Sequence, residues 1–134
     1  MTVASLQLQA ELAEMPRLVG WVAEQAEALG LTGRQRYAIE LCLEEVVANL
    51  VMHGRPSGCS PIAITIRLET APLRLTVEDD AIPFDATAPL ALAQPQTLAE
   101  ASPGGLGLRL VQGFSAWRDY AREEGRNRLT LGFA

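Results

Sequence analysis

The stretch IELCLEEVVANLVMHG, residues 39–54, carries the pattern that decides the fold. Within it, Glu45, Asn49 and His53 are spaced four apart, so on a helix they follow one face with a drift of about 40° per step. Apolar side chains run beside this polar stripe and predict a long helix that packs against a core on one side. These apolar residues are Leu43, Val46, Val47, Leu50 and Val51.

Asn49 is the unusual member of this helix, because asparagine is a poor helix former that normally occupies caps and turns. One interpretation is a metal–phosphate site, in which the side-chain oxygen of Asn49 binds Mg²⁺ and Glu45 accepts a proton. The alternative is a half-exposed helix with a few polar positions. The helix alone leaves both interpretations open.

The composition is that of an ordinary globular chain, and it excludes several functions. The 134 residues are 49% hydrophobic and 20% charged, so we expect one domain spanning residues 1–134. The net charge of −5 argues against nucleic-acid binding. All eleven basic residues are Arg, so the lysine of a P-loop is absent.

The same survey argues against a membrane protein and against a zinc protein. No apolar run reaches eighteen residues and no export signal is visible, so we expect a cytoplasmic protein. Cys42 and Cys59 stand at a spacing that suits no metal motif, and the chain has one His. We expect both cysteines to be free thiols in a reducing compartment.

The rest of the chain alternates between strand-like and helix-like patterns. Thr32 is a good N-cap for the long helix, which is expected to end near His53. We expect an α+β two-layer sandwich, with a mixed, mostly antiparallel sheet and helices on one face. The expected strands are residues 2–9, 62–69, 73–79, 117–122 and 128–133, the other expected helices are 14–29 and 106–115, and a hairpin turn is expected at 123–127.

A second motif is VEDDAIPFD, residues 77–85, in which a strand ends at Asp79 and the chain then turns. An acidic side chain fixed there can accept a hydrogen bond from an exocyclic amine such as that of adenine. The alternative is an acidic strand-to-loop turn with no ligand.

A third motif is SPGGLGLRLV, residues 102–111. Gly104, Gly105 and Gly107 would let the backbone approach a ligand closely, and the helix that follows would point its N–H groups and positive dipole end at it. An anion such as a triphosphate is the natural guest. Taken alone, a glycine-rich helix start is a weak signal.

The order of the three motifs resembles the GHKL ATPases, and most closely the bacterial anti-sigma factor serine kinases of the histidine-kinase-like group. The resemblance runs nearly the whole chain and implies a Bergerat-type ATP-binding fold. It implies that Asn49 binds Mg²⁺, that Glu45 activates the attacking hydroxyl and that Asp79 reads adenine, with residues 86–103 as an ATP lid. The implied nucleotide-binding residues are Asn49, His53, Asp79, Ala81, Phe84, Gly104, Gly105, Leu106, Gly107, Leu108 and Arg109.

Ala81 departs from the family, whose second motif reads Asp-x-Gly. Glycine suits that position because the backbone passes close to the purine and can need a positive φ. We therefore expect Ala81 to weaken ATP binding rather than abolish it, and Ala81→Gly to tighten binding.

The resemblance implies an ATP-dependent protein serine/threonine kinase that also holds a sigma factor. In such a partner-switching system, a STAS-type anti-sigma factor antagonist displaces the sigma factor and is then phosphorylated. One alternative is a nucleotide-gated binding module without phosphotransfer, and another is an ATP-hydrolysing regulator of a different target. A homodimer through the first helix is also expected, since Leu18, Trp21 and Val22 offer more apolar surface than one face needs; alternatively, Trp21 belongs to the core.

Overall fold

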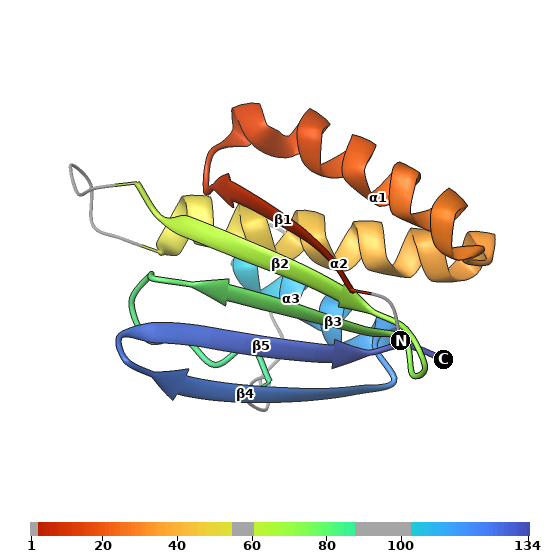
Figure 1. The fold of residues 1–134 in the computed structure, drawn as a ribbon. Helices are drawn as coiled ribbons and strands as arrows, with labels where there is room; N and C mark the ends of the chain where they lie inside the picture. Colours follow the sequence, from red (N-terminus) through yellow and green to blue (C-terminus); the bar gives the residue numbers. More distant parts are fainter. Residues whose placement is uncertain (1–2, 55–60, 88–102) are drawn as a thin grey trace.

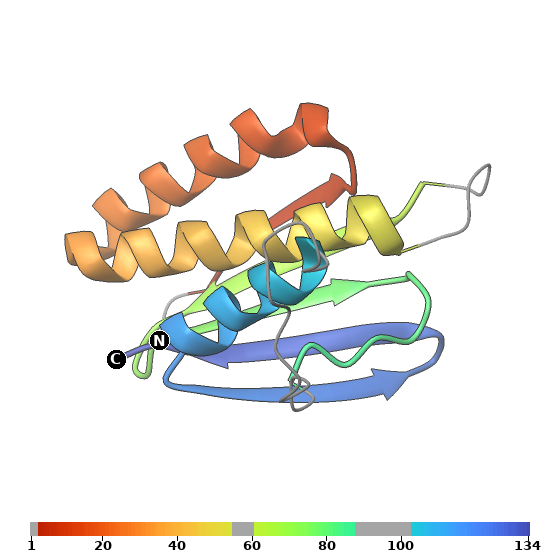
Figure 2. The same cartoon turned by 180° about the vertical axis from the view of Figure 1, so that it is seen from behind.

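The computed structural model describes residues 3–54, 61–87 and 103–134, without the side chains of residue 3 and residues 103–108. Five strands form one sheet in the order β1-β2-β3-β5-β4 (Figure 1). The three long helices all lie on one face of this sheet, as the view from behind makes clear (Figure 2). The strands are β1 (Val3–Gln9), β2 (Ala63–Glu69), β3 (Arg74–Asp79), β4 (Trp117–Glu123) and β5 (Arg126–Gly132), and the helices are α1 (Met15–Leu29), α2 (Gly33–His53) and α3 (Pro103–Phe114).

This arrangement confirms the α+β class and refines one detail of it. Every strand pair in the described sheet is antiparallel, whereas the sequence predicted a mixed sheet. The chain leaves β3 and returns through α3 to the far edge as β4. It then folds back as β5 between β4 and β3, so both new pairs run antiparallel.

The core lies between the sheet and the helices, and it follows from the alternation along each strand. On β2, Ile64, Ile66 and Leu68 are buried, while the residues between them face away from the helices. On α2, Ile39 and Leu43 are fully buried against this surface. The long helix therefore presents its apolar side to the sheet, as predicted.

The helix ends are fixed by local signals that the sequence carries. The Thr32 side chain accepts from the backbone N–H of Gln35, and the Gln35 side chain accepts from the backbone N–H of Thr32, which makes a capping box. Gly30 ends α1 in the left-handed conformation with φ of 65°. The predicted start of the long helix is confirmed.

Trp21 belongs to the core and not to a surplus apolar surface. Its side chain is 9% exposed, and Leu18 and Val22 beside it are 1% exposed. The apolar surface that suggested a homodimer is therefore buried inside the protomer. Dimerisation stays a prediction without that motive.

Two boundaries differ from those predicted. α3 begins at Pro103 rather than at residue 106, so the three glycines lie within its first turns, and proline takes the position where its missing N–H costs nothing. The hairpin turn is also shorter than predicted: Glu123 pairs with Arg126, and only Glu124 and Gly125 lie between them. Their φ values of 51° and 76° suit a two-residue hairpin turn.

The proposed ATP lid falls mostly on residues 88–102, outside the described residues. Within the part of the chain that the structure describes, no helix combines the length and apolar character needed to cross a membrane.

Candidate functional site

A small cavity lies between α2 and the inner face of the sheet. Its volume is about 30 Å³, which is room for about one water molecule. The motif on α2 and the motif after β3 both contribute to its wall, so they meet at one place. The lining residues are Val46, Asn49 and Leu50 of α2, Val77 and Asp79 of β3, Phe84 and Ala86 of the next loop, Tyr120 of β4, and Asn127 and Leu129 of β5.

Asp79 ends β3 on the inner face, where it is 7% exposed. Its Oδ1 accepts from the backbone N–H of Ala81 at 3.0 Å and from the side-chain amide of Asn127 at 2.8 Å. Its Oδ2 has no hydrogen-bond partner among the described residues. Burial raises the pKa of Asp79, although these two hydrogen bonds lower it and offset part of the effect. A buried acceptor on the cavity wall is therefore left open.

The side chain of Asn127 joins Asp79 to the loop that follows it. Asn127 is the strand partner of Asp79 across β3 and β5 and is 3% exposed. Besides bonding Asp79, its amide donates to the carbonyl of Ile82 at 2.8 Å. Its oxygen accepts from the Tyr120 hydroxyl at 2.6 Å, from Arg122 Nη1 at 3.1 Å and from the backbone N–H of Phe84 at 3.3 Å.

The loop after Asp79 is also attached to the end of α2. The backbone N–H of Ile82 donates to the carbonyl of Gly54 at 3.1 Å. A Cβ at Gly54 would lie 2.6 Å from the Leu50 carbonyl oxygen and would collide with Ile62, so this position needs glycine. The close packing explains why glycine follows His53 in the first motif.

Asn49 is the residue of the first motif that reaches the cavity. It is half-buried, and its carboxamide has no hydrogen-bond partner among the described residues. Glu45 lies one turn earlier and is half-buried, and His53 lies one turn later and is exposed. Neither of these two lines the cavity, so the four-residue stripe drifts away from it on both sides.

Ala81 packs in the core and is not among the residues that line the small cavity. It is 2% exposed, belongs to the core, and packs beside Gly54 rather than along the cavity. It is not among the residues with positive φ, so its backbone conformation suits an L-residue. The expectation that its methyl group faces the purine is therefore not supported, and alanine fits here without strain.

The third motif brings a helix start to this side of the molecule. Gly104, Gly105, Leu106, Gly107 and Leu108 all lie in the first turns of α3, and α3 packs against α2. Arg109, the next residue, is exposed. The N-terminal end of a helix carries free N–H groups and partial positive charge, which favour phosphate.

The described residues offer little for a metal that needs a full protein cage. Among them, no group of three or more His, Cys, Asp or Glu side chains could hold a metal ion. Mg²⁺ is different, since it commonly takes one or two protein oxygens together with phosphates and water. The open side-chain oxygen of Asn49 fits that pattern.

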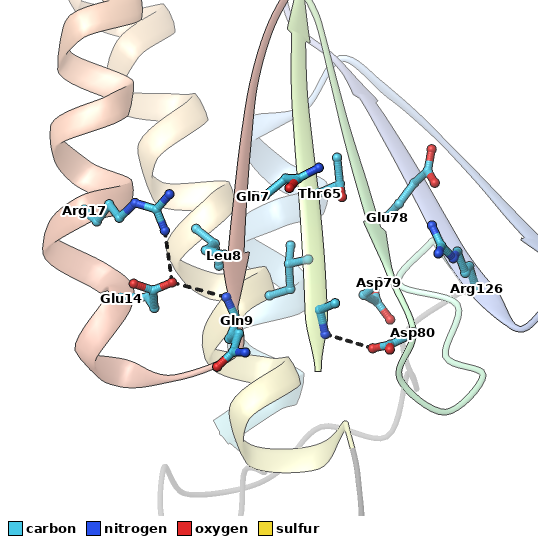
Figure 3. A pocket seen from close by; sticks show the side chains of 12 residues that line it. Gln7, Leu8, Gln9, Glu14, Arg17, Thr65, Glu78, Asp79, Asp80 and Arg126 are labelled. Atoms are coloured by element: carbon cyan, nitrogen blue, oxygen red, sulfur yellow. Dashed lines mark hydrogen bonds and ion pairs between the residues drawn. The ribbon is translucent and has the colours of Figure 1, made fainter. Parts of the chain in front are cut away.

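A second and larger depression lies on the opposite face of the sheet. Figure 3 shows it around the ends of β1, β2 and β3, with a volume of about 500 Å³. Asp80 accepts there from the backbone N–H of Ala63 at 2.9 Å, and Glu14 pairs with Arg17 at 3.2 Å. Of the motif side chains that the sequence singled out, Asp79 lines this depression as well as the small cavity, whereas Glu45, Asn49 and His53 do not line it.

Sequence reasoning missed Asn127, Tyr120 and Arg122. The signal that could have found Asn127 is Gly125, because glycine readily takes the positive φ that a two-residue hairpin turn requires. Counting from such a turn puts Asn127 in the strand, on the same face as Leu129 and Leu131. The predicted five-residue turn hid this alternation.

The chain belongs to the histidine kinase-like ATPase family, because the Histidine kinase-like ATPase domain matches residues 8–133. The serine/threonine-protein kinase BtrW of Bordetella bronchiseptica is 34% identical over 101 residues, which make up 75% of this chain and 71% of BtrW. The family that the three motifs predicted is confirmed, with a named protein kinase among its relatives.

Two solved structures share the fold. The RsbU and RsbW domains of Rv1364c from Mycobacterium tuberculosis match 99% of this chain and 32% of that chain, with a TM-score of 0.64 and 17% identity. The histidine kinase domain of the blue-light activated histidine kinase EL346 from Erythrobacter litoralis matches 90% of this chain and 59% of that chain, with a TM-score of 0.51 and 20% identity. This chain therefore spans about a third and about three-fifths of their lengths, and the likeness is one of fold.

Proposed function

We propose that the protein is an ATP-dependent protein serine/threonine kinase that also acts as an anti-sigma factor in the cytoplasm. The observation that carries this proposal is the pair of open polar groups at one cavity, Asn49 on α2 and Oδ2 of Asp79 on β3. One suits a metal–phosphate group and the other suits the amine of a base. Family membership and the kinase relative support the same function.

Adenine is the base that Asp79 is suited to read. Its buried Oδ2 can accept a hydrogen bond from the exocyclic amine, while apolar side chains such as Val77 and Leu129 pack beside the ring. The cavity of about 30 Å³ is far below the roughly 300–1,000 Å³ of typical ligand pockets, so binding must widen it. The wall formed by Phe84 and Ala86 belongs to a loop and can move more readily than α2 or the sheet.

The transfer step assigns roles to Asn49 and Glu45 of the first motif and to the start of α3. The side-chain oxygen of Asn49 would hold Mg²⁺ together with the nucleotide phosphates, and the ion would neutralise phosphate charge. Glu45 accepts the proton of the attacking Ser or Thr hydroxyl. The hydroxyl oxygen bonds to the γ-phosphorus, and ADP leaves. The start of α3 directs backbone N–H groups toward the phosphates.

The partners follow from the resemblance of the motifs to anti-sigma factor kinases. They are a sigma factor, which the protein holds inactive, and a STAS-type antagonist, which is the phosphate acceptor. The decisive experiment incubates the protein with Mg²⁺, ATP labelled at the γ-phosphate and the STAS-type proteins of its own organism. Label on a Ser or Thr of one of them supports the proposal.

The same experiment tests the alternative of a nucleotide-gated binding module. Tight ATP binding with no label on any STAS-type protein would replace the kinase by that module. Failure to bind ATP at all would exclude both the kinase and the nucleotide-gated binding module.

A further inference from the structure

We propose that Asn127 is a positioning residue that fixes the carboxylate of Asp79 with Oδ2 toward the nucleotide base. The inference rests on the proposed function, because it deepens the adenine-reading role of Asp79. Asn127 would thereby sharpen the preference of Asp79 for an amino purine over an oxo purine, because it holds the acceptor in place.

The first step is that the carboxamide of Asn127 has only one acceptable orientation. Its oxygen accepts from three donors, the Tyr120 hydroxyl, Arg122 Nη1 and the backbone N–H of Phe84. Rotating the group by half a turn would point its NH₂ at these donors and its oxygen at the acceptors on the other side. The NH₂ must therefore face Asp79 and the Ile82 carbonyl.

The second step is that this NH₂ occupies one chosen oxygen of Asp79. Oδ1 receives the Asn127 amide at 2.8 Å and the backbone N–H of Ala81 at 3.0 Å. Both donors converge on the same atom, so Oδ1 is taken and Oδ2 is presented. The carboxylate is then fixed by two bonds at one end and open at the other.

The third step concerns what a substitution at position 79 would do. In Asp79→Asn the two donors would still require an oxygen at the Oδ1 position, which forces the new NH₂ into the place of Oδ2. An acceptor facing the base would become a donor. That donor opposes the amine of adenine but suits the 6-oxo group of hypoxanthine. The orientation that Asn127 imposes on residue 79 therefore decides which purine this variant favours.

The test measures affinities for Mg-ATP and Mg-ITP by calorimetry in four proteins: the unaltered protein, Asp79→Asn, Asn127→Ala and the control Thr130→Ala. Thr130 lies on the opposite face of the same strand. We expect the unaltered protein and the control to prefer ATP. Asp79→Asn should lose this preference or reverse it, with ATP weakened by about tenfold to a hundredfold, the range for a mispaired buried polar group.

Asn127→Ala should lower the ratio of ATP to ITP affinity by about tenfold, because the Asp79 carboxylate then keeps only the bond from Ala81 and no longer holds an oxygen fixed opposite the adenine amine. A purely structural role would instead weaken both nucleotides equally, and that result would overturn the proposal. If Asn127→Ala does not fold by circular dichroism, Asp79→Asn decides alone: a retained preference for ATP over ITP would overturn it.

Failure of the proposed function looks different. If the unaltered protein binds ATP and ITP equally and Asp79→Asn changes neither affinity, Asp79 does not read the base. In that case the adenine assignment falls first, and the role of Asn127 falls with it.

Discussion

The two depressions on either side of the end of β3 differ in nearly every property that matters for binding. The inner cavity has about 30 Å³, and the outer cleft has about 500 Å³. The inner one has apolar walls and two polar groups without hydrogen-bond partners among the described residues, Asn49 and Oδ2 of Asp79. The outer one has a wall of mixed polar and apolar residues, and Asp80 and Glu14 in this wall already have partners. As a binding site, the outer cleft is favoured by its volume, whereas the inner cavity is favoured by its polar groups without hydrogen-bond partners.

The last residue of β3, Asp79, and the residue that follows it, Asp80, supply the two acids. Asp79 is buried on the inner face of the sheet, whereas Asp80 lines the outer cleft and accepts from the backbone N–H of Ala63. Burial raises the pKa of the inward carboxylate, Asp79. The comparison shows that burial and missing partners, rather than residue type, mark the candidate site.

The largest expected effect is on the rate of phosphate transfer, and it distinguishes the helix side of the sheet from the outer cleft. Glu45→Gln should lower the rate of phosphate transfer by about a hundredfold to ten-thousandfold, the usual contribution of a general base, with ATP affinity nearly unchanged. Glu78→Gln, in the outer cleft, should leave the rate as it is. Single-turnover transfer assays check both. Equal loss of ATP affinity in Glu45→Gln would make Glu45 a structural residue.

The next-largest effect distinguishes the inner cavity from the outer cleft by the affinity for Mg-ATP. Asp79→Asn should weaken Mg-ATP by about tenfold to a hundredfold, since it puts a donor opposite the adenine amine. Asp80→Asn keeps an oxygen that can accept from Ala63 and should bind ATP like the unaltered protein. Calorimetry on the matched pair tests this. A larger loss in Asp80→Asn would move the site to the outer cleft.

A smaller effect concerns Ala81, which lies in the core between the two regions. Ala81→Gly removes a buried methyl group and adds backbone freedom to the unfolded chain, so it should cost about 1–2 kcal/mol of stability. ATP affinity should change little, because the side chain does not line the cavity. Urea unfolding and calorimetry measure the two quantities. Tighter ATP binding in this variant would restore the original expectation that the methyl group faces the purine.

The smallest effect is a pH-dependent gain in stability. Burial raises the pKa of Asp79 above its ordinary value of 3.8, so the ionised carboxylate destabilises the folded protein, and the cost is relieved as pH falls through the raised pKa. Asp79→Asn carries no charge and should melt slightly higher than the unaltered protein at neutral pH. The difference should shrink on acidification toward pH 3.8. A difference that grows on acidification would mean that Asp79 is stabilising when ionised.

Much of the fold was readable from the sequence because its signals are local. The capping pair Thr32 and Gln35, the stop at Gly30 and the alternation of β2 each depend on neighbouring residues, and each is confirmed by the structure. The mixed sheet was a wrong prediction because strand direction depends on how the chain returns after α3, which no local pattern encodes.

The site was readable in part. Spacing identified Asn49 and Asp79, which do line one cavity, but it could not show that the stripe drifts away at Glu45 and His53. It also assigned Ala81 to the ligand side, since a family motif says which residue is present and not which way a side chain points. Asn127 is 48 residues from Asp79 in sequence, and only the register between β3 and β5 brings the two together.

The two-residue turn at Glu124 and Gly125 has a consequence for how this chain can change over generations. Adding or deleting one residue there would shift β5 by one position, turning Asn127 toward solvent and an arginine neighbour toward the cavity. Sequence changes in this turn must therefore keep its length and use residues that tolerate positive φ. A surface hairpin thus constrains the candidate site as firmly as the residues that line it.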